Sequence, residues 1–262
     1  MRALAVVVLS AVAAAVAVDC WQLSHSASVA APPAPHRAPT PASRPASQTA
    51  PVGDPGAATP PPGTTLVAST HGAIPGYASP GAASDMTVPA SFFGYPSVMP
   101  VIASQPGWLE VRLAQRPNGS TTWVQESDVT LSDTPYEIVV NLATMHLLVY
   151  RNGKAILDFP AGIGAPSSPT PPGQYFIFAT VPPPNASYGP FVLATSDHSD
   201  TYTDWEDSGD AIIGIHGPIT SYDDSLIGNT GAAISNGCIR LHDADLAQLA
   251  MIPPGTPLVV AA

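Results

Sequence analysis

The chain of 262 residues has little positive charge and little cysteine. Lysine occurs once, at Lys154, and lysine and arginine together number 8 against 19 acidic residues, which gives a formal net charge of −11. Because no basic stripe is available to displace phosphate counterions, we expect no nucleic acid partner. Two cysteines, Cys20 and Cys238, are too few for a disulfide scaffold or a cysteine-ligated zinc site. We expect no bound metal and no cofactor.

Proline, in contrast, is abundant. The chain has 32 prolines, well above the ~5% usual in globular proteins, so part of it is not folded core. Eleven of them lie in residues 31–62, among alanine, serine, threonine and glycine. A stretch without apolar periodicity cannot bury enough surface to offset the entropy of ordering. We predict a flexible linker over residues 19–90, with a coil span of roughly 45 Å. A low-complexity tail with no tethering role fits the composition equally well.

The chain begins with a short apolar segment. Arg2 precedes an apolar run over residues 3–18 that only Ser10 interrupts. A basic residue before a short apolar core predicts an export signal, whereas a membrane span usually needs ~20 residues. An uncleaved membrane anchor stays open, as does lipidation of Cys20, although Asp19 before it is atypical of lipoprotein signals. We therefore expect an exported, monomeric protein of the cell envelope, with or without a membrane tether.

Two mostly β units follow the linker. In the first, over residues 91–132, the β-branched and aromatic runs 97–104, 108–114 and 121–126 predict strands, and Asn118-Gly119 predicts a hairpin turn. Its segments 107–113 and 121–124 resemble the bacterial SH3-like modules that precede catalytic domains in cell-wall enzymes. The resemblance implies a small SH3-like β-barrel. An irregular β lobe without a binding role is the alternative.

The second unit, over residues 135–262, is large enough for its own core. Its predicted strands are 137–142, 145–151, 154–159, 173–180, 191–195, 211–216 and 258–260. Asn152-Gly153 predicts a type I′ hairpin turn. One short helix is expected from an N-cap at Asp243 to Met251, where prolines stop it. An acidic run over residues 197–210 predicts a solvated loop over a cleft, in which Tyr202 or Trp205 would pack against substrate; calcium ligation is the less favoured alternative.

Cys238 is the only cysteine in the predicted folded part. In an oxidising compartment a lone thiol is a liability unless it is buried or used. At an ordinary pKa of about 8.5 the thiol is mostly protonated at neutral pH, so a nucleophilic role needs a base. His216, at the end of a predicted strand, is the candidate base. Gly237 would let the backbone approach a substrate and present amides to an oxyanion. An inert buried cysteine stays open on the residues alone.

A family resemblance bears on this choice. His216-Gly217, followed by Ser-Asn-Gly-Cys-Ile-Arg-Leu at 235–241, resembles the signature of the L,D-transpeptidase catalytic domain, the YkuD family. Segments 162–164, 169–176 and 255–259 resemble other parts of the same domain, in the same order. The resemblance implies a β-sandwich-like catalytic domain with one short helix.

The resemblance also implies roles for individual residues. Cys238 would be the acyl-enzyme nucleophile and His216 the general base. Ser235 would orient the histidine through the backbone, and the amides of Gly237 and Cys238 would bind the oxyanion. Asn236 is placed in the same oxyanion and orientation group. Arg240 would hold a substrate carboxylate or steady the site, and Gly217 would contribute to substrate binding. Asn236 departs from the family pattern, which usually has histidine there. An amide can donate and accept hydrogen bonds but cannot titrate, and His242 is expected to be a surface residue.

The implied reaction is acyl transfer between peptidoglycan stem peptides, which would be the partners. The thiolate would attack the carbonyl before the terminal D-alanine of a tetrapeptide stem, and an amine of a neighbouring stem would complete a 3–3 cross-link. Water or a protein lysine as acceptor would make the enzyme a carboxypeptidase or a lipoprotein-attaching enzyme. A catalytically inactive, peptidoglycan-binding envelope protein is the alternative from a different class. Carbapenems are expected to acylate Cys238.

Overall fold

The computed structural model describes residues 63–204, 209–228 and 232–262. The predicted export segment, Cys20 and most of the predicted linker lie outside these residues. By their contacts, the described residues all fall within one compact unit, 50–262. None of the helices in the described ranges is both long and apolar enough to span a bilayer.

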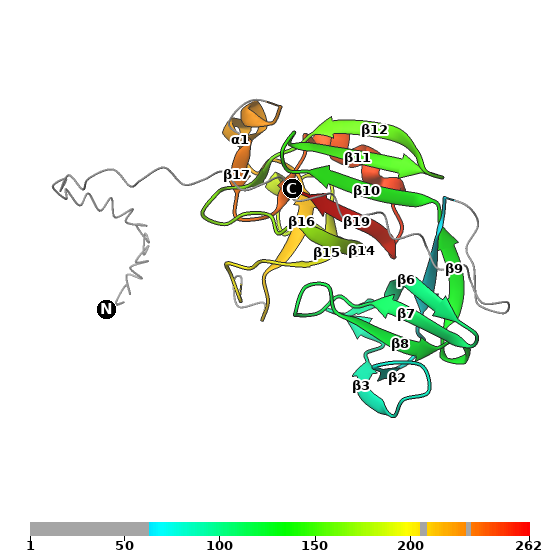
Figure 1. Ribbon diagram of the computed structural model, residues 1–262. Coiled ribbons are helices and arrows are strands. Elements are labelled where there is room, and N and C mark those ends of the chain that lie inside the picture. The colour runs from blue at the N-terminus through cyan, green and yellow to red at the C-terminus, as the bar shows by residue number, and fades with distance from the viewer. Residues whose placement is uncertain (1–62, 205–208, 229–231) are drawn as a thin grey trace, which may run out of the picture. The chain divides into compact units, whose positions relative to one another are not determined.

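A seven-stranded sheet forms the N-terminal part of this unit, in the order β3-β2-β8-β7-β6-β1-β9 (Figure 1). Its strands are β1 (Thr65–Ser69), β2 (Ile74–Tyr77), β3 (Ser84–Val88), β6 (Val98–Gln105), β7 (Trp108–Arg112), β8 (Thr121–Gln125) and β9 (Thr130–Thr134). A two-stranded hairpin, β4 (Ser91–Phe92) with β5 (Tyr95–Pro96), and a 3-10 turn, η1 (Glu126–Asp128), accompany it. We call residues 65–134 the N-terminal module. The SH3-like resemblance stays a prediction.

Strands β1–β3 correct the predicted linker. They lie inside residues 19–90, so the linker was predicted to end too late. β1 pairs with β6 on one side and with β9 on the other. Both partners lie far along the chain, and local composition does not reveal such non-local pairing.

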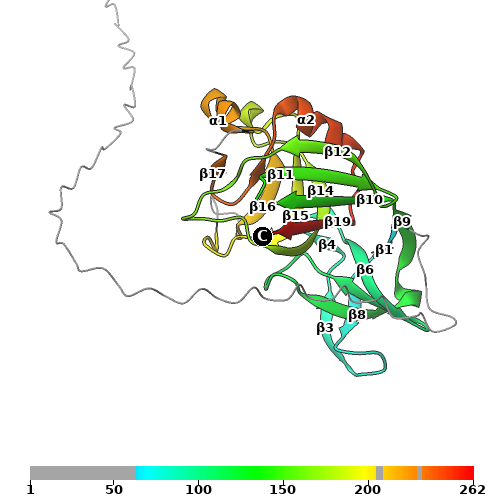
Figure 2. The same ribbon diagram turned by 45° about the horizontal axis from the view of Figure 1, so that its top comes forward.

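The C-terminal part contains a mixed, curled sheet of eight strands, in the order β12-β11-β10-β19-β14-β15-β16-β18 (Figures 1 and 2). Its strands are β10 (Tyr136–Asn141), β11 (His146–Arg151), β12 (Lys154–Pro160), β14 (Gly173–Val181), β15 (Val192–His198), β16 (Ile212–His216), β18 (Ile239–Arg240) and β19 (Thr256–Ala261). A separate pair joins β13 (Ile163–Gly164) to β17 (Ala233–Ser235). Residues 135–262 are therefore mostly β, as predicted, and their main element is a curled eight-stranded sheet.

Both predicted hairpin turns are present. Asn118-Gly119 lies in the β7–β8 connection, where Gly119 has φ 81°. Asn152 and Gly153, with φ 50° and 72°, connect β11 to β12. Positive φ at both central residues is the type I′ geometry that Asn-Gly favours.

The prediction of a single helix is wrong. The described residues contain two α-helices, α1 (Ser221–Leu226) and α2 (Asp243–Gln248), and the further 3-10 turns η2 (Ala186–Tyr188) and η3 (Leu249–Met251). Helix α1 begins after Thr220, whose hydroxyl accepts a hydrogen bond from the Asp223 amide at 3.0 Å, a capping signal that the sequence contains. The N-cap of α2 is His242, because this residue has a non-helical backbone, with φ −57° and ψ 144°, and Asp243 is already helical.

Strand β14 is buried on both faces. Tyr175 and Ile177 belong to the core of the C-terminal sheet, together with residues of α2. Phe176 and Phe178 belong instead to the core of the N-terminal module, with Met99, Leu109 and others. This two-sided burial explains the nearly continuous apolar run of β14. The two sheets therefore share a core through β14.

Candidate active site

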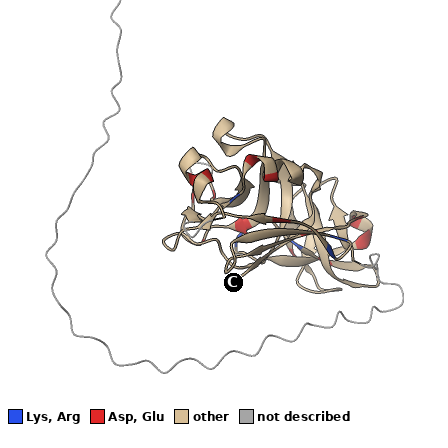
Figure 3. Ribbon diagram, turned by 90° about the horizontal axis from the view of Figure 1, so that it is seen from above, with Lys and Arg blue, Asp and Glu red and all other residues tan. Residues whose placement is uncertain are grey.

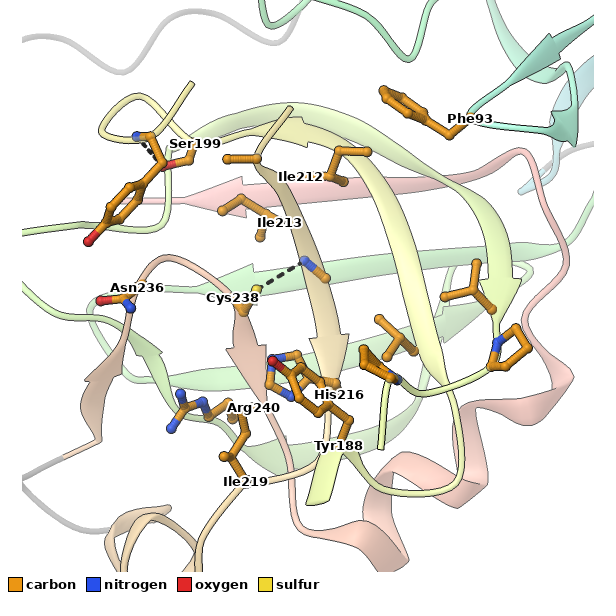
Figure 4. A pocket seen from close by; sticks show the side chains of 17 residues that line it. Phe93, Tyr188, Ser199, Ile212, Ile213, His216, Ile219, Asn236, Cys238 and Arg240 are labelled. Carbon is orange, nitrogen blue, oxygen red and sulfur yellow. Dashed lines mark hydrogen bonds between the residues drawn. The ribbon is translucent and has the colours of Figure 1, made fainter. Parts of the chain in front are cut away.

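Strands β16 and β18 bring the two predicted catalytic residues to one face of the sheet. The strands pair in parallel, with Ile215 beside Ile239 and His216 beside Arg240. Continuing this register one residue back places Cys238 beside Gly214. Gly214 precedes His216 by two residues along β16, so Cys238 and His216 lie on the same face of the sheet. The Gly214 amide donates a hydrogen bond to the Cys238 sulfur at 3.4 Å. Figure 4 shows both side chains at the same pocket.

The turn before Cys238 depends on Gly237. Its φ is 116°, and a Cβ at this position would come within 2.6 Å of Ile213 Cδ1. The Ser235 hydroxyl donates to the Cys238 carbonyl at 2.5 Å and accepts from the Gly237 amide at 3.1 Å. These bonds hold the turn in the shape that presents Cys238 to the pocket.

The segment 168–170 holds this turn from outside. The Thr170 hydroxyl donates to the Gly237 carbonyl at 2.7 Å and accepts from the Gly164 amide at 2.9 Å. The Ser168 hydroxyl donates to the Asn236 carbonyl at 3.0 Å. Both hydroxyl-bearing residues are buried. This part of the family-like motif therefore positions the cysteine turn without lining the pocket.

His216 is buried and carries the geometry of a neutral base. Its Nδ1 lies 2.7 Å from the Gly217 carbonyl, so this nitrogen is the donor and Nε2 is left as the acceptor. The Tyr188 ring packs on the imidazole, with the ring centroids 4.7 Å apart. The pKa of His216 is lowered to about 4, mainly by burial and also by the nearby Arg240, while the hydrogen bond to the Gly217 carbonyl opposes the shift. The imidazole is neutral at pH 7.

Cys238 is half-buried, with a protonated thiol at neutral pH. Burial raises the pKa of the thiol, and the Gly214 amide and Arg240 oppose this effect. The resting pair is thus a thiol and an imidazole. A nucleophilic role for Cys238 would therefore require transfer of the thiol proton to Nε2 of His216.

Three predicted roles change on inspection of the contacts. The described contacts of Ser235 shape the cysteine turn, whereas the Gly217 carbonyl orients the histidine. Gly217 does not line the pocket; a Cβ there would lie 2.4 Å from the Asp243 carboxylate, which explains the glycine. The Gly237 amide already bonds to Ser235, so in this conformation the Cys238 amide is the better placed candidate for an oxyanion.

Arg240 lies at the pocket and is already paired. Its Nη1 is 2.9 Å from an Asp223 carboxylate oxygen and 3.4 Å from the Pro218 carbonyl. Basic residues are sparse along the described ribbon (Figure 3), and this one is partly neutralised. The pairing supports the steadying role of Arg240 more than a role as a free carboxylate receptor.

The pocket has a volume of about 470 Å³ and two chemically different ends (Figure 4). Cys238, His216, Arg240 and the exposed Asn236 side chain lie at the reactive end. The rest is mostly apolar; its lining is Phe93, Val181, Pro182, Pro184, Tyr188, Val192, Ser199, Tyr202, Ala211, Ile212, Ile213, Gly214 and Ile219. Sequence reasoning missed Phe93 and Tyr188 because neither belongs to a recognisable motif.

The acidic run is not one solvated loop. Asp197 and His198 end strand β15 and are fully buried, which corrects the prediction. His198 Nδ1 lies 2.8 Å from an Asp210 carboxylate oxygen. Tyr202 lines the pocket, whereas Trp205 lies outside the described residues. Among the residues that the structure describes, no cluster of His, Cys, Asp or Glu could hold a metal ion. His242 is partly exposed and pairs with Asp224 at 2.6 Å, away from the pocket.

Comparison with known proteins shows what the part of the chain that contains this pocket is similar to. Residues 135–260 match the model of the L,D-transpeptidase catalytic domain, YkuD. Proteins named as candidate L,D-transpeptidases YkuD, from Bacillus licheniformis and Bacillus subtilis, are 31% and 28% identical over 46% and 48% of this chain. The matches cover 61% and 66% of the length of those relatives. The solved L,D-transpeptidase from Mycobacterium smegmatis is 17% identical, over 59% of this chain and 91% of that one, with a TM-score of 0.37. Residues 135–260 are therefore similar in sequence to the L,D-transpeptidase catalytic domain, YkuD.

Proposed function

We propose that this protein is a cysteine-dependent L,D-transpeptidase that forms 3–3 cross-links between peptidoglycan stems in the cell envelope. The acyl donor would be a tetrapeptide stem, and the leaving group its terminal D-alanine. The observation that carries the proposal is the β16–β18 register, which places the thiol of Cys238 and the Nε2 acceptor of His216 on one face of a pocket.

The chemistry follows from the protonation states. As Cys238 sulfur attacks the donor carbonyl, its proton passes to His216 Nε2, and a sulfur–carbon bond forms. The Cys238 amide would stabilise the oxyanion. Collapse breaks the carbon–nitrogen bond, and the imidazolium gives its proton to the departing amine of D-alanine. A thioester acyl-enzyme remains.

The second half-reaction uses the same groups with their roles reversed. An amine of a neighbouring stem attacks the thioester, forms the new amide bond and releases the thiol, while His216 accepts and returns a proton. Water as acceptor would give a carboxypeptidase, and a protein lysine a lipoprotein-attaching enzyme. Analysis of the products made from a tetrapeptide stem, with and without an acceptor stem, separates these three outcomes.

The direct test of the nucleophile is covalent labelling. We expect the purified chain to gain the mass of one carbapenem molecule, because the strained carbonyl of the drug meets the same thiol. Cys238→Ala should gain none. An unlabelled wild-type chain, or an adduct that persists in Cys238→Ala, would contradict the proposal and favour an inactive wall-binding protein.

A further inference from the structure

Phe93 has a backbone conformation that a bulky aromatic residue rarely adopts. It is the first central residue of the two-residue turn between β4 and β5, where Phe92 pairs with Tyr95. Phe93 and Gly94 have φ 51° and 83°, the type I′ geometry that favours Asn-Gly. A bulky aromatic residue at positive φ is an outlier and points to a function for its side chain.

That side chain reaches the catalytic pocket. Phe93 is 47% exposed, yet it packs on Phe178 of β14, with ring centroids 5.6 Å apart, and approaches the His198 ring at 6.3 Å. It also lines the pocket that contains Cys238. In Figure 4, Ile212 lies between Phe93 and Cys238 along the pocket. A residue of the N-terminal module thus contributes to the apolar part of the pocket.

The same module holds another part of the pocket wall. Arg116, in the β7–β8 connection, donates from Nη2 to the carbonyls of Ser199 and Tyr202 at 3.1 and 2.9 Å, and its Nε pairs with Asp210 at 2.9 Å. The Asn118 amide group donates to the His198 carbonyl at 2.8 Å and accepts from the His198 amide at 2.9 Å. Ser199 and Tyr202 both line the pocket.

We propose that the N-terminal module contributes residues to the substrate-binding site. Phe93 is a specificity-determining wall that takes an apolar portion of the acyl donor, and Arg116 and Asn118 are positioning residues for the wall that contains Ser199 and Tyr202. This inference rests on the proposed function for the identity of the donor. Its tests measure the reactivity of Cys238 and hydrogen exchange, neither of which depends on the identity of the donor, so the two proposals can fail separately.

The first experiment compares two thiol reagents on the full chain. Iodoacetamide is small, whereas N-phenylmaleimide carries an aromatic ring that can pack on Phe93. In Phe93→Asn we expect the ratio of the phenylmaleimide rate to the iodoacetamide rate to fall by about 3–10-fold, with the iodoacetamide rate unchanged. Asn suits this turn, so the variant should be at least as heat-stable as wild type. Ile102→Ala, an equally exposed apolar residue of the module, is the control and should leave the ratio unchanged.

The second experiment addresses positioning. Arg116→Ala should speed hydrogen exchange of the amides in residues 199–204 and lower the same reagent ratio, without changing the iodoacetamide rate. Arg112→Ala is the matched control, because Arg112 also contacts the C-terminal sheet, through Gln174, but not the pocket wall. An unchanged ratio in Phe93→Asn, or exchange in Arg116→Ala equal to that in Arg112→Ala, would overturn the inference. A wild-type chain that reacts with both reagents but not with a carbapenem would contradict only the proposed function.

Discussion

Cys238 and His216 meet as two neutral groups, because burial disfavours the charge on each. The low pKa of His216 makes the imidazole a weaker base. It also widens the pH range in which Nε2 is unprotonated, so the imidazole stays a proton acceptor in mildly acidic solution. The neutral state of both groups also distinguishes this pair from a resting thiolate–imidazolium pair, which would react fast with any alkylating agent.

A pH profile tests this protonation state. With the pKa of His216 at about 4, carbapenem acylation of Cys238 should stay level from pH 7 to pH 5 and fall only near pH 4, after correction for drug stability. His216→Gln should slow acylation by about 10²–10⁴-fold. His242→Gln is the control and should have little effect, because His242 lies outside the pocket. A decline centred near pH 6.5 would show that the imidazole titrates as an ordinary exposed one.

At the scale of elements, the site is built where a tight turn meets a strand pair. Strand β18 has only two residues, and the turn before it is held by buried hydroxyls of segment 168–170. Position and hydrogen bonding of this short segment therefore decide where the sulfur points.

Thr170→Val tests this support. The change keeps the shape but removes the partner of the Gly237 carbonyl and of the Gly164 amide, both buried. Leaving two such groups unpaired costs about 2–4 kcal/mol, so thermal unfolding should shift down and acylation of Cys238 should slow by about tenfold. Thr121→Val, at an exposed strand position, should change neither. Loss of stability with full acylation would mean that the turn keeps its shape without Thr170.

Sequence patterns predicted the elements whose signals are local. Alternation and Asn-Gly turns were enough for β6–β8 and β10–β12, and the motif resemblance was enough to select Cys238 and His216, which line one pocket. Strand β1 was missed because its two partners are distant in sequence. Asn118 was recognised as a turn residue. Its side-chain hydrogen bonds to His198 were missed because a local turn signal says nothing about contacts between distant residues.

At the scale of the whole molecule, two sheets share a core and a buried polar contact. Phe176 and Phe178 fill the N-terminal core from β14. Beside them, the buried Asp197 carboxylate accepts a hydrogen bond from Asn118 at 3.2 Å. Burial raises the pKa of Asp197 to about 8, while hydrogen bonds from Tyr175 and Asn118 oppose the shift. The junction between the sheets is therefore sensitive to pH.

The direction in which folding stability changes with pH can be measured. Because the folded-state pKa of Asp197 is raised, its contribution to stability is full below the unfolded value near 3.8 and is lost as pH rises through about 8. Between pH 6.5 and 8, wild type should lose stability, whereas Asp197→Asn should be flatter and more stable at pH 8 by about 1–3 kcal/mol. Urea unfolding at several pH values measures this. Asp85→Asn, at an exposed site of β3, should keep the wild-type slope, and an equal slope in Asp197→Asn would contradict the assignment.

The central place of β19 constrains the order in which the C-terminal sheet can assemble. This strand lies between β10, to which it is parallel, and β14, to which it is antiparallel. Until residues 256–261 have emerged from a ribosome or an export channel, β10 and β14 have no common neighbour, and the sheet stays in two pieces. Closure at this late strand spans more than a hundred residues of intervening chain, a slow step by its loop entropy. Assembly of the C-terminal sheet, and with it the pocket that contains Cys238 and His216, should therefore wait for residues 256–261.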